Sequence, residues 1–275
     1  MKEIAIRKSI RNYQQRPLTQ ADIDLINTYL SDDRHLTGPH GNLIRLKILV
    51  DPSLNQNEQI GTYGFIKHAQ GYLMGACSNT PQAIFDFGYV FEGVILHLTS
   101  IGIGTCWLGG TFDRQESMKY LALGDNEIIP AISPLGYAME NRHMKDRLIR
   151  QVIRADHRKA ADQLFFYETF GQALGSHGQA YRQALDYVRL APSAKNKQPW
   201  RIVVSADESK VHFYIASSLS NDKSFACPPE YLDIGIAYRH FVIGMIEQGI
   251  QGHLVVEDPG IAKPDNVEYI ASWVC

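Results

Sequence analysis

The segment DFGYVFEGVILHLTSIG, residues 86–102, has a counterpart in DIGIAYRHFVIGMIEQG, residues 233–249. Each begins with Asp-x-Gly, continues as an apolar run and reaches a glycine sixteen residues after its aspartate. The apolar content predicts a long buried helix in both places, and a glycine commonly follows the end of a helix. Two copies of such a helix predict an internal repeat, and this repeat decides the architecture.

The segments around the two helices repeat as well. LIRLKILV (43–50) matches QPWRIVVS (198–205), and each predicts a strand that is followed by a second apolar strand. Each half also has a closing strand, at 128–137 and at 267–274. We therefore predict an α+β protein in which mixed sheets pack around long central helices. Its two similar halves form one compact unit, a pseudo-dimer, with the expected bounds 1–153 and 154–275.

Smaller elements can be placed from local signals. Thr19 has Asp22 three residues later, which resembles a capping box, so a helix is expected over 20–30. The further expected elements are a long helix at 81–100, a strand at 71–77, a short helix at 113–123 and a partly helical segment at 55–70.

Composition restricts the class of protein. The chain has 275 residues, of which 45% are hydrophobic and 20% charged, as in globular proteins. A net charge of −2 argues against non-specific nucleic-acid binding, and no apolar run has the length of a membrane span or signal peptide. The four cysteines are scattered, without zinc spacing. We expect a cytoplasmic protein without nucleic-acid or membrane partners and without a bound metal.

The N-terminal segment carries Arg7, Ser9 and Arg11 at alternate positions. Extended backbone would project these three side chains to one face, where two guanidinium groups and a hydroxyl suit a phosphate monoester. A solvated basic terminus explains the same residues.

Two further stretches have the chemistry of a binding loop. TCWLGGTF (105–112) follows the first long helix, and its paired glycines would let backbone N–H groups approach a ligand. A plain glycine turn fits equally well. LAPSAKNKQPWRIVV (190–204) passes from a helix through a small polar loop into a strand, and its prolines oppose helix formation. That loop could hold the edge of a planar heterocycle, or be an ordinary turn with its Trp in the core.

The halves have kept different stretches. GPHGN (38–42) stands in the first half where PSAKN (192–196) stands in the second, and Val255–Glu257 stand opposite Leu108–Gly110. A twofold body would have two equivalent sites at its interface. The sequence therefore predicts one complete composite site and one that has lost its binding residues.

The motifs RKSIRNY (7–13), GIGTCWLGG (102–110), APSAKNKQPW (191–200) and PLGYAMEN (134–141) resemble those of the nitroreductase family of FMN-dependent oxidoreductases. Ordinary members of this family are homodimers with two FMN sites at the subunit interface. Because this chain carries both contributions in separate repeats, it resembles a duplicated, single-chain branch of the family, expected to function as a monomer.

The resemblance implies a role for each matching residue. Arg7, Ser9 and Arg11 would hold the FMN phosphate and ribityl chain, with Lys8 at the phosphate or ring edge and Arg142 or Lys145 completing the anion site. The flavin ring would be contacted by both loops: by Leu108, Gly109 and Gly110 of the glycine-bearing loop, and by Pro192, Ser193, Ala194 and Asn196 of the polar loop. Gln198 would brace the second loop.

The resemblance also implies a reaction. NADH or NADPH would reduce the flavin, which would then reduce a small electron acceptor such as a nitroarene or quinone. The flavin supplies the chemistry, so no catalytic side chain is predicted. Two alternatives are an FMN-binding carrier or sensor with little turnover, and a paralogue that keeps the fold without flavin.

Overall fold

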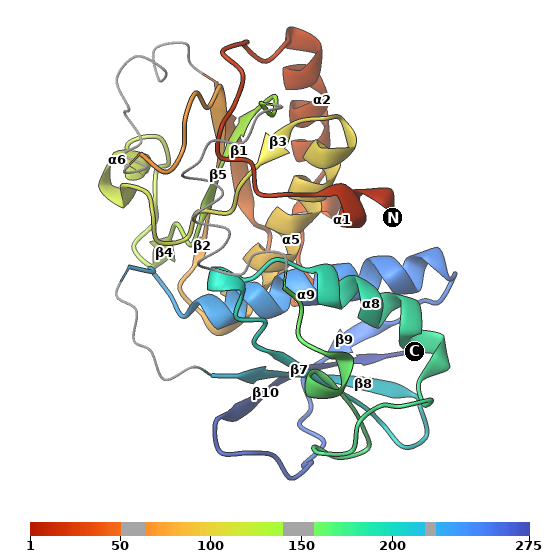
Figure 1. Ribbon diagram of the computed structural model, residues 1–275. Coiled ribbons are helices and arrows are strands. Elements are labelled where there is room, and N and C mark those ends of the chain that lie inside the picture. Colours follow the sequence, from red (N-terminus) through yellow and green to blue (C-terminus); the bar gives the residue numbers. More distant parts are fainter. Residues whose placement is uncertain (51–63, 140–156, 218–223) are drawn as a thin grey trace.

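The computed structural model describes residues 1–50, 64–139, 157–217 and 224–275. Two long helices, α5 (Pro81–Ser100) and α9 (Pro229–Glu247), pack against each other at its centre. The first sheet lies beside α5 in the upper part of Figure 1, and the second sheet lies beneath α9 in the lower part. This is the predicted α+β arrangement of sheets around central helices.

Glycines allow the two central helices to approach closely. A Cβ atom on Gly88 would lie 2.3 Å from the carbonyl oxygen of Leu232, and one on Gly235 would lie 2.1 Å from that of Phe85. Gly88 corresponds to Gly235 in the repeat, and Phe85 corresponds to Leu232. The helix crossing therefore has the same contact on both sides, which is consistent with an internal duplication.

The two sheets share one strand order. The first runs β1 (Arg45–Leu49), β2 (Gly71–Ser78), β5 (Ile132–Gly136), β3 (Gly104–Thr105), with β4 (Glu127–Ile128) also pairing with β2. The second runs β6 (Phe165–Tyr167), β7 (Trp200–Val204), β8 (Lys210–Ala216), β10 (Val267–Val274), β9 (His253–Val255). From β1 and from β7 onward, neighbours along each order are antiparallel, and β6 adds a parallel edge to the second sheet.

Shorter helices and turns connect these elements. They are α1 (Lys2–Ile6), α2 (Gln20–Leu30), α3 (Asp33–Leu36), α6 (Arg114–Met118) and α8 (Arg182–Leu190), with 3₁₀ turns η1 (Ala161–Gln163), η2 (Gln179–Tyr181) and η3 (Ala194–Asn196). Helices α1 and α8 pack against the central helices. Thr19 accepts the backbone N–H of Asp22, so the predicted cap of α2 is confirmed.

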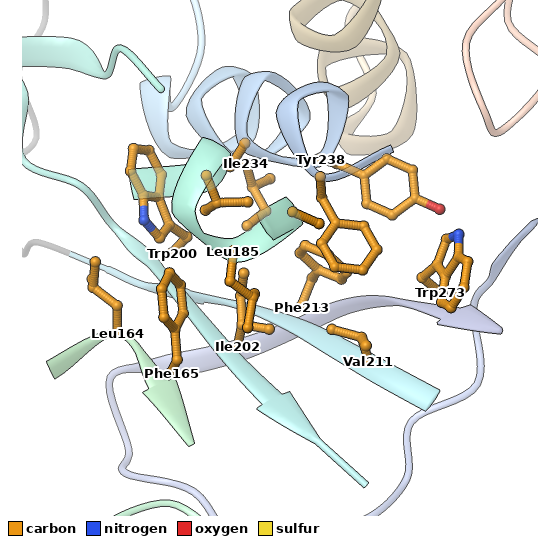
Figure 2. Close-up of a cluster of buried hydrophobic side chains, with 14 of the residues drawn as sticks. Leu164, Phe165, Leu185, Trp200, Ile202, Val211, Phe213, Ile234, Tyr238 and Trp273 are labelled. Carbon is orange, nitrogen blue, oxygen red and sulfur yellow. The ribbon is translucent and has the colours of Figure 1, made fainter. Parts of the chain in front are cut away.

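The second half has a large aromatic core between its sheet and helices α8 and α9. Figure 2 shows Trp200, Phe213 and Tyr238 among the side chains that fill the space between the strands and these helices. Trp200 and Phe213 have no exposed surface. Burial of Trp200 at the start of β7 anchors the end of the loop that precedes it.

Most predicted elements were confirmed, and three were not as expected. Helices 20–30 and 81–100 and strand 267–274 have the predicted bounds. The expected strand 128–137 is divided into β4 and β5, with Pro130 between them, and the expected helix 113–123 ends at Met118. Helix α1 had not been predicted, and most of 55–70 and the boundary between the halves lie outside the described residues.

Candidate functional site

A cavity of about 380 Å³ lies between the two halves of the chain. Its volume is in the range of small-molecule sites. The lining is mostly apolar and comes from both halves: Ser9, Arg11, Phe65, Trp107, Leu108, Gly109, Gly110, Thr111, Ala131, Pro192, Ser193, Ala194, Lys195, Ser224, Phe225, Pro229, Leu232, Asp233 and Ile236. The structure thus brings together three stretches that the sequence singled out separately.

Short bridges hold the first-half residues in place. Ser9 forms a parallel bridge with Thr105, and the N–H of Ile10 donates to the Thr105 carbonyl at 2.7 Å. Leu108 exchanges backbone hydrogen bonds with Ile132 at 2.9 and 3.0 Å. The N-terminal segment and the glycine loop are therefore attached to the first sheet, and extended backbone carries Ser9 and Arg11 to the cavity.

The glycines of the first loop make room for the second half of the chain. A Cβ on Gly109 would lie 2.8 Å from the ring of Phe225, and one on Gly110 would lie 2.7 Å from Ser224 Oγ. Arg114 donates to the carbonyls of Gly109 and Ser224, which joins the two segments. The absence of a side chain at Gly109 leaves room for the Phe225 ring in the cavity wall, a role that the sequence does not predict.

The polar loop of the second half has a strained but well-bonded backbone. Lys195, Asn196 and Gln198 have φ angles of 51°, 55° and 49°, in the left-handed region. The Gln198 N–H donates to Ser193 Oγ at 2.9 Å, which closes the loop on itself. The 3₁₀ turn η3 lies between the two prolines that oppose a longer helix.

Asn196 and Gln198 brace this loop and do not line the cavity. The Asn196 side-chain amide donates to the His157 carbonyl at 2.9 Å. Gln198 is 1% exposed, and its Oε1 accepts the Lys159 N–H at 2.9 Å. The bracing role expected for Gln198 agrees with these bonds, whereas Asn196 is directed to the backbone rather than to the cavity.

Arg7 also lies away from the cavity lining. Its Nε is 3.7 Å from Oε1 of Glu92, a fully buried residue of α5. The other Glu92 oxygen accepts the indole N–H of Trp107 at 2.7 Å, and Oε1 lies 3.0 Å from His240 Nε2. Arg7 therefore contributes to a buried network behind the cavity wall. Lys8 is exposed and absent from the lining, and Arg142 and Lys145 lie outside the described residues.

Asp233, at the start of α9, is a lining residue that sequence reasoning had used only as a repeat marker. It is 4% exposed, and its Oδ1 accepts the Ala194 N–H at 2.9 Å. Burial raises the pKa of Asp233 well above its usual value. Phe65, Trp107 and Phe225 were also missed as site residues, and only Trp107 lies in a motif that could have indicated it.

A smaller cavity of about 140 Å³ is lined by residues that include counterparts, in the proposed repeat, of those that line the larger one. His40 and Phe85 line it where Ala194 and Leu232 line the larger one. The His40 ring lies 2.9 Å from Asp86 Oδ1 and packs edge-on against Phe85. Side chains thus occupy space here that is open in the larger cavity.

The fold is similar to that of several solved structures. A “putative nitroreductase” from Thermotoga maritima superposes over 99% of this chain and 92% of its own, with a TM-score of 0.62 and 17% identity. A nitroreductase family protein from Clostridium difficile is 18% identical over 55% of this chain and 91% of its own, with a TM-score of 0.43. A nitroreductase with bound FMN from Desulfitobacterium hafniense is 19% identical over 53% of this chain and 94% of its own, also at 0.43.

The sequence comparisons give the family. A search of the curated proteins found no match. Within the described residues, no helix combines the length and apolar character needed to cross a bilayer. The profile of the family described as “Putative TM nitroreductase” matches residues 1–245, which is most of the chain. The chain therefore belongs to this nitroreductase family.

Proposed function

We propose that the chain binds one FMN in the larger cavity and uses it to transfer electrons from NADH or NADPH to a small acceptor such as a nitroarene or quinone. The observation that supports this best is the composition of the cavity. A hydroxyl and a guanidinium group, from Ser9 and Arg11, accompany predominantly apolar walls. A phosphate attached to a planar heterocycle requires such a combination of surfaces.

The residues fit FMN in the following way. Arg11 and Ser9 would bind the phosphate, while Trp107 and Leu108 would face the ring from the first half. The segment Pro192–Ala194 would close the site from the second half. Bound FMN would supply hydride transfer, and the chain would position the ring and shield it from water.

Arg7 has an indirect role in this proposal. Its pairing with Glu92 accompanies the hydrogen bond that fixes the Trp107 indole. The proposal therefore assigns phosphate binding to Arg11 and Ser9, and assigns Arg7 to the support of the cavity wall.

Both sides of the cavity come from one chain, so we also propose that the protein works as a monomer. The expected compartment is the cytoplasm, where nicotinamide cofactors are available and buried thiols such as Cys77 and Cys227 remain reduced.

The test is to purify the protein, reconstitute it with FMN, and add NADH or NADPH without oxygen. Bleaching of the bound flavin, followed by its reoxidation on addition of a quinone or nitroarene, is the expected result. A chain that retains no flavin after reconstitution would refute the proposal. Flavin that neither nucleotide reduces would instead favour the carrier or sensor.

A further inference from the structure

Asp86 and Asp233 occupy equivalent positions in the two halves, but their carboxyl groups have different surroundings. Asp86 accepts the backbone N–H groups of His40 and Asn42 and the Asn42 side-chain amide, and it lies 2.9 Å from His40 Nδ1. Both of its oxygens are therefore occupied by the loop that it holds. Asp86 is fully buried and does not line the larger cavity.

Asp233 holds the corresponding loop with a single bond. Among the described residues, its carboxyl accepts one hydrogen bond, from the Ala194 N–H to Oδ1. Ala194 has no polar side chain in the place of His40, and the Asn196 amide donates to His157 instead of to the aspartate. Asp233 lines the larger cavity, and among the described residues its second oxygen accepts no hydrogen bond.

We propose that Asp233 is a binding residue for the electron acceptor, and that its protonated carboxyl donates a hydrogen bond to a carbonyl or nitro oxygen of that molecule. This inference rests on the proposed function. The Pro192–Ala194 loop, to which Asp233 is bonded, lines the cavity from the second half of the chain, whereas Ser9 and Arg11 line it from the first half. A neutral acid there favours uncharged oxygen acceptors, whereas a carboxylate would repel them.

The environment of Asp233 supports a neutral acid. Burial is the largest effect on its pKa and raises it, and Glu230 on α9 raises it further. The Ala194 N–H and Lys197 act in the opposite direction. The cations that line the same cavity are Lys195 and Arg11. Helix α5 contacts α9 near Asp233 through the backbone of Phe85, which meets Gly235. The hydrogen bond to the acceptor should therefore be present at low pH and be lost as pH rises through the raised pKa.

The experiment measures binding without turnover. The FMN-loaded, oxidised protein is titrated with duroquinone, an uncharged quinone, over a range of pH in the absence of NADH and NADPH. Wild-type Kd should increase about tenfold or more as Asp233 ionises. Asp233→Asn, which keeps a donor without titrating, should bind with a Kd independent of pH, and Asp233→Ala should bind about tenfold more weakly at low pH.

Asp86→Asn is the matched control, because it removes the equivalent carboxyl outside the larger cavity. It should keep the wild-type pH profile. Identical profiles for wild type and Asp233→Asn would overturn the inference while leaving FMN binding intact.

Two further measurements cover the remaining outcomes. If Asp233→Asn does not fold, infrared difference spectra of the wild type should show a protonated carboxyl C=O band that shifts on quinone binding, and its absence would refute the inference. If the wild type retains no FMN, the proposed function fails. Quenching of Trp fluorescence by duroquinone in flavin-free wild type and Asp233→Asn then tests Asp233 separately.

Discussion

At the scale of single residues, the wall of the candidate site is supported by a buried glutamate and the three side chains that surround it. Glu92 is fully buried on α5, where an isolated carboxylate would be costly. It is stabilised by the Trp107 indole, His240 and Arg7. The network connects the cavity wall to the helix crossing, and it explains why Arg7 is held behind the wall while Arg11 reaches the cavity.

Arg11→Gln should weaken FMN binding by roughly ten- to a hundredfold, because a hydrogen bond to a charged group contributes about 1.5–3 kcal/mol. Isothermal titration of the flavin-free protein measures this. Riboflavin, which lacks the phosphate, is the matched ligand and should bind wild type and variant equally. An equal loss for both ligands would show that Arg11 supports the fold rather than the phosphate.

The raised pKa of Asp233 predicts a pH-dependent stability. Because the folded-state pKa lies above the unfolded one, stability is greatest below the usual Asp pKa and falls as pH rises toward the folded-state value. Asp233→Asn lacks this loss and retains an acceptor for the Ala194 N–H. Urea unfolding should show the variant gaining stability relative to wild type as pH rises through this window. Parallel pH curves for the two proteins would contradict the assignment.

The positions of single residues could be predicted from the sequence where the backbone directs the side chain. Extended backbone carries Ser9 and Arg11 together to the cavity, as alternation predicts. Arg7 follows the same alternation, but a buried carboxylate on a distant helix competes for it. Phe65 and Phe225 line the cavity because of chain packing that no local pattern indicates.

At the scale of elements, the crossing of α5 and α9 positions both sides of the cavity. Leu232, Asp233 and Ile236 of α9 line it close to the contact of Gly235 with the backbone of Phe85. A small change in the separation of these helices would therefore alter the cavity. The long helices could be predicted because an apolar run of this length is too long for a strand. Helix α1 has only five residues, which is too short to show helical periodicity.

Gly235→Ala should destabilise the fold by about 1–3 kcal/mol or more, because its Cβ would lie 2.1 Å from a backbone oxygen that cannot move alone. The gain in helix propensity, about 1 kcal/mol, does not offset this. Gly93→Ala on α5 is the control, since its Cβ would meet the flexible Arg239 side chain at 3.0 Å. Chemical denaturation should rank Gly235→Ala well below Gly93→Ala, and equal stabilities would refute the tight crossing.

At the scale of the whole molecule, the two cavities that correspond in the proposed repeat differ in volume. The larger has a volume of about 380 Å³ and the smaller about 140 Å³, with His40 directed to Asp86 in the smaller one. From differences such as GPHGN against PSAKN, the sequence predicts that one of the two sites has lost its binding residues, and unequal cavities are consistent with this. The sequence could not predict how far the smaller cavity had closed, because that depends on the packing of His40 against Phe85.

The central claim is that one chain builds one composite FMN site, and the ratio of FMN to chain tests it most directly. Native mass spectrometry of the reconstituted protein gives this ratio and the oligomeric state together. We predict a monomer with one FMN. Two FMN per chain, or FMN retained only by a dimer, would contradict the account.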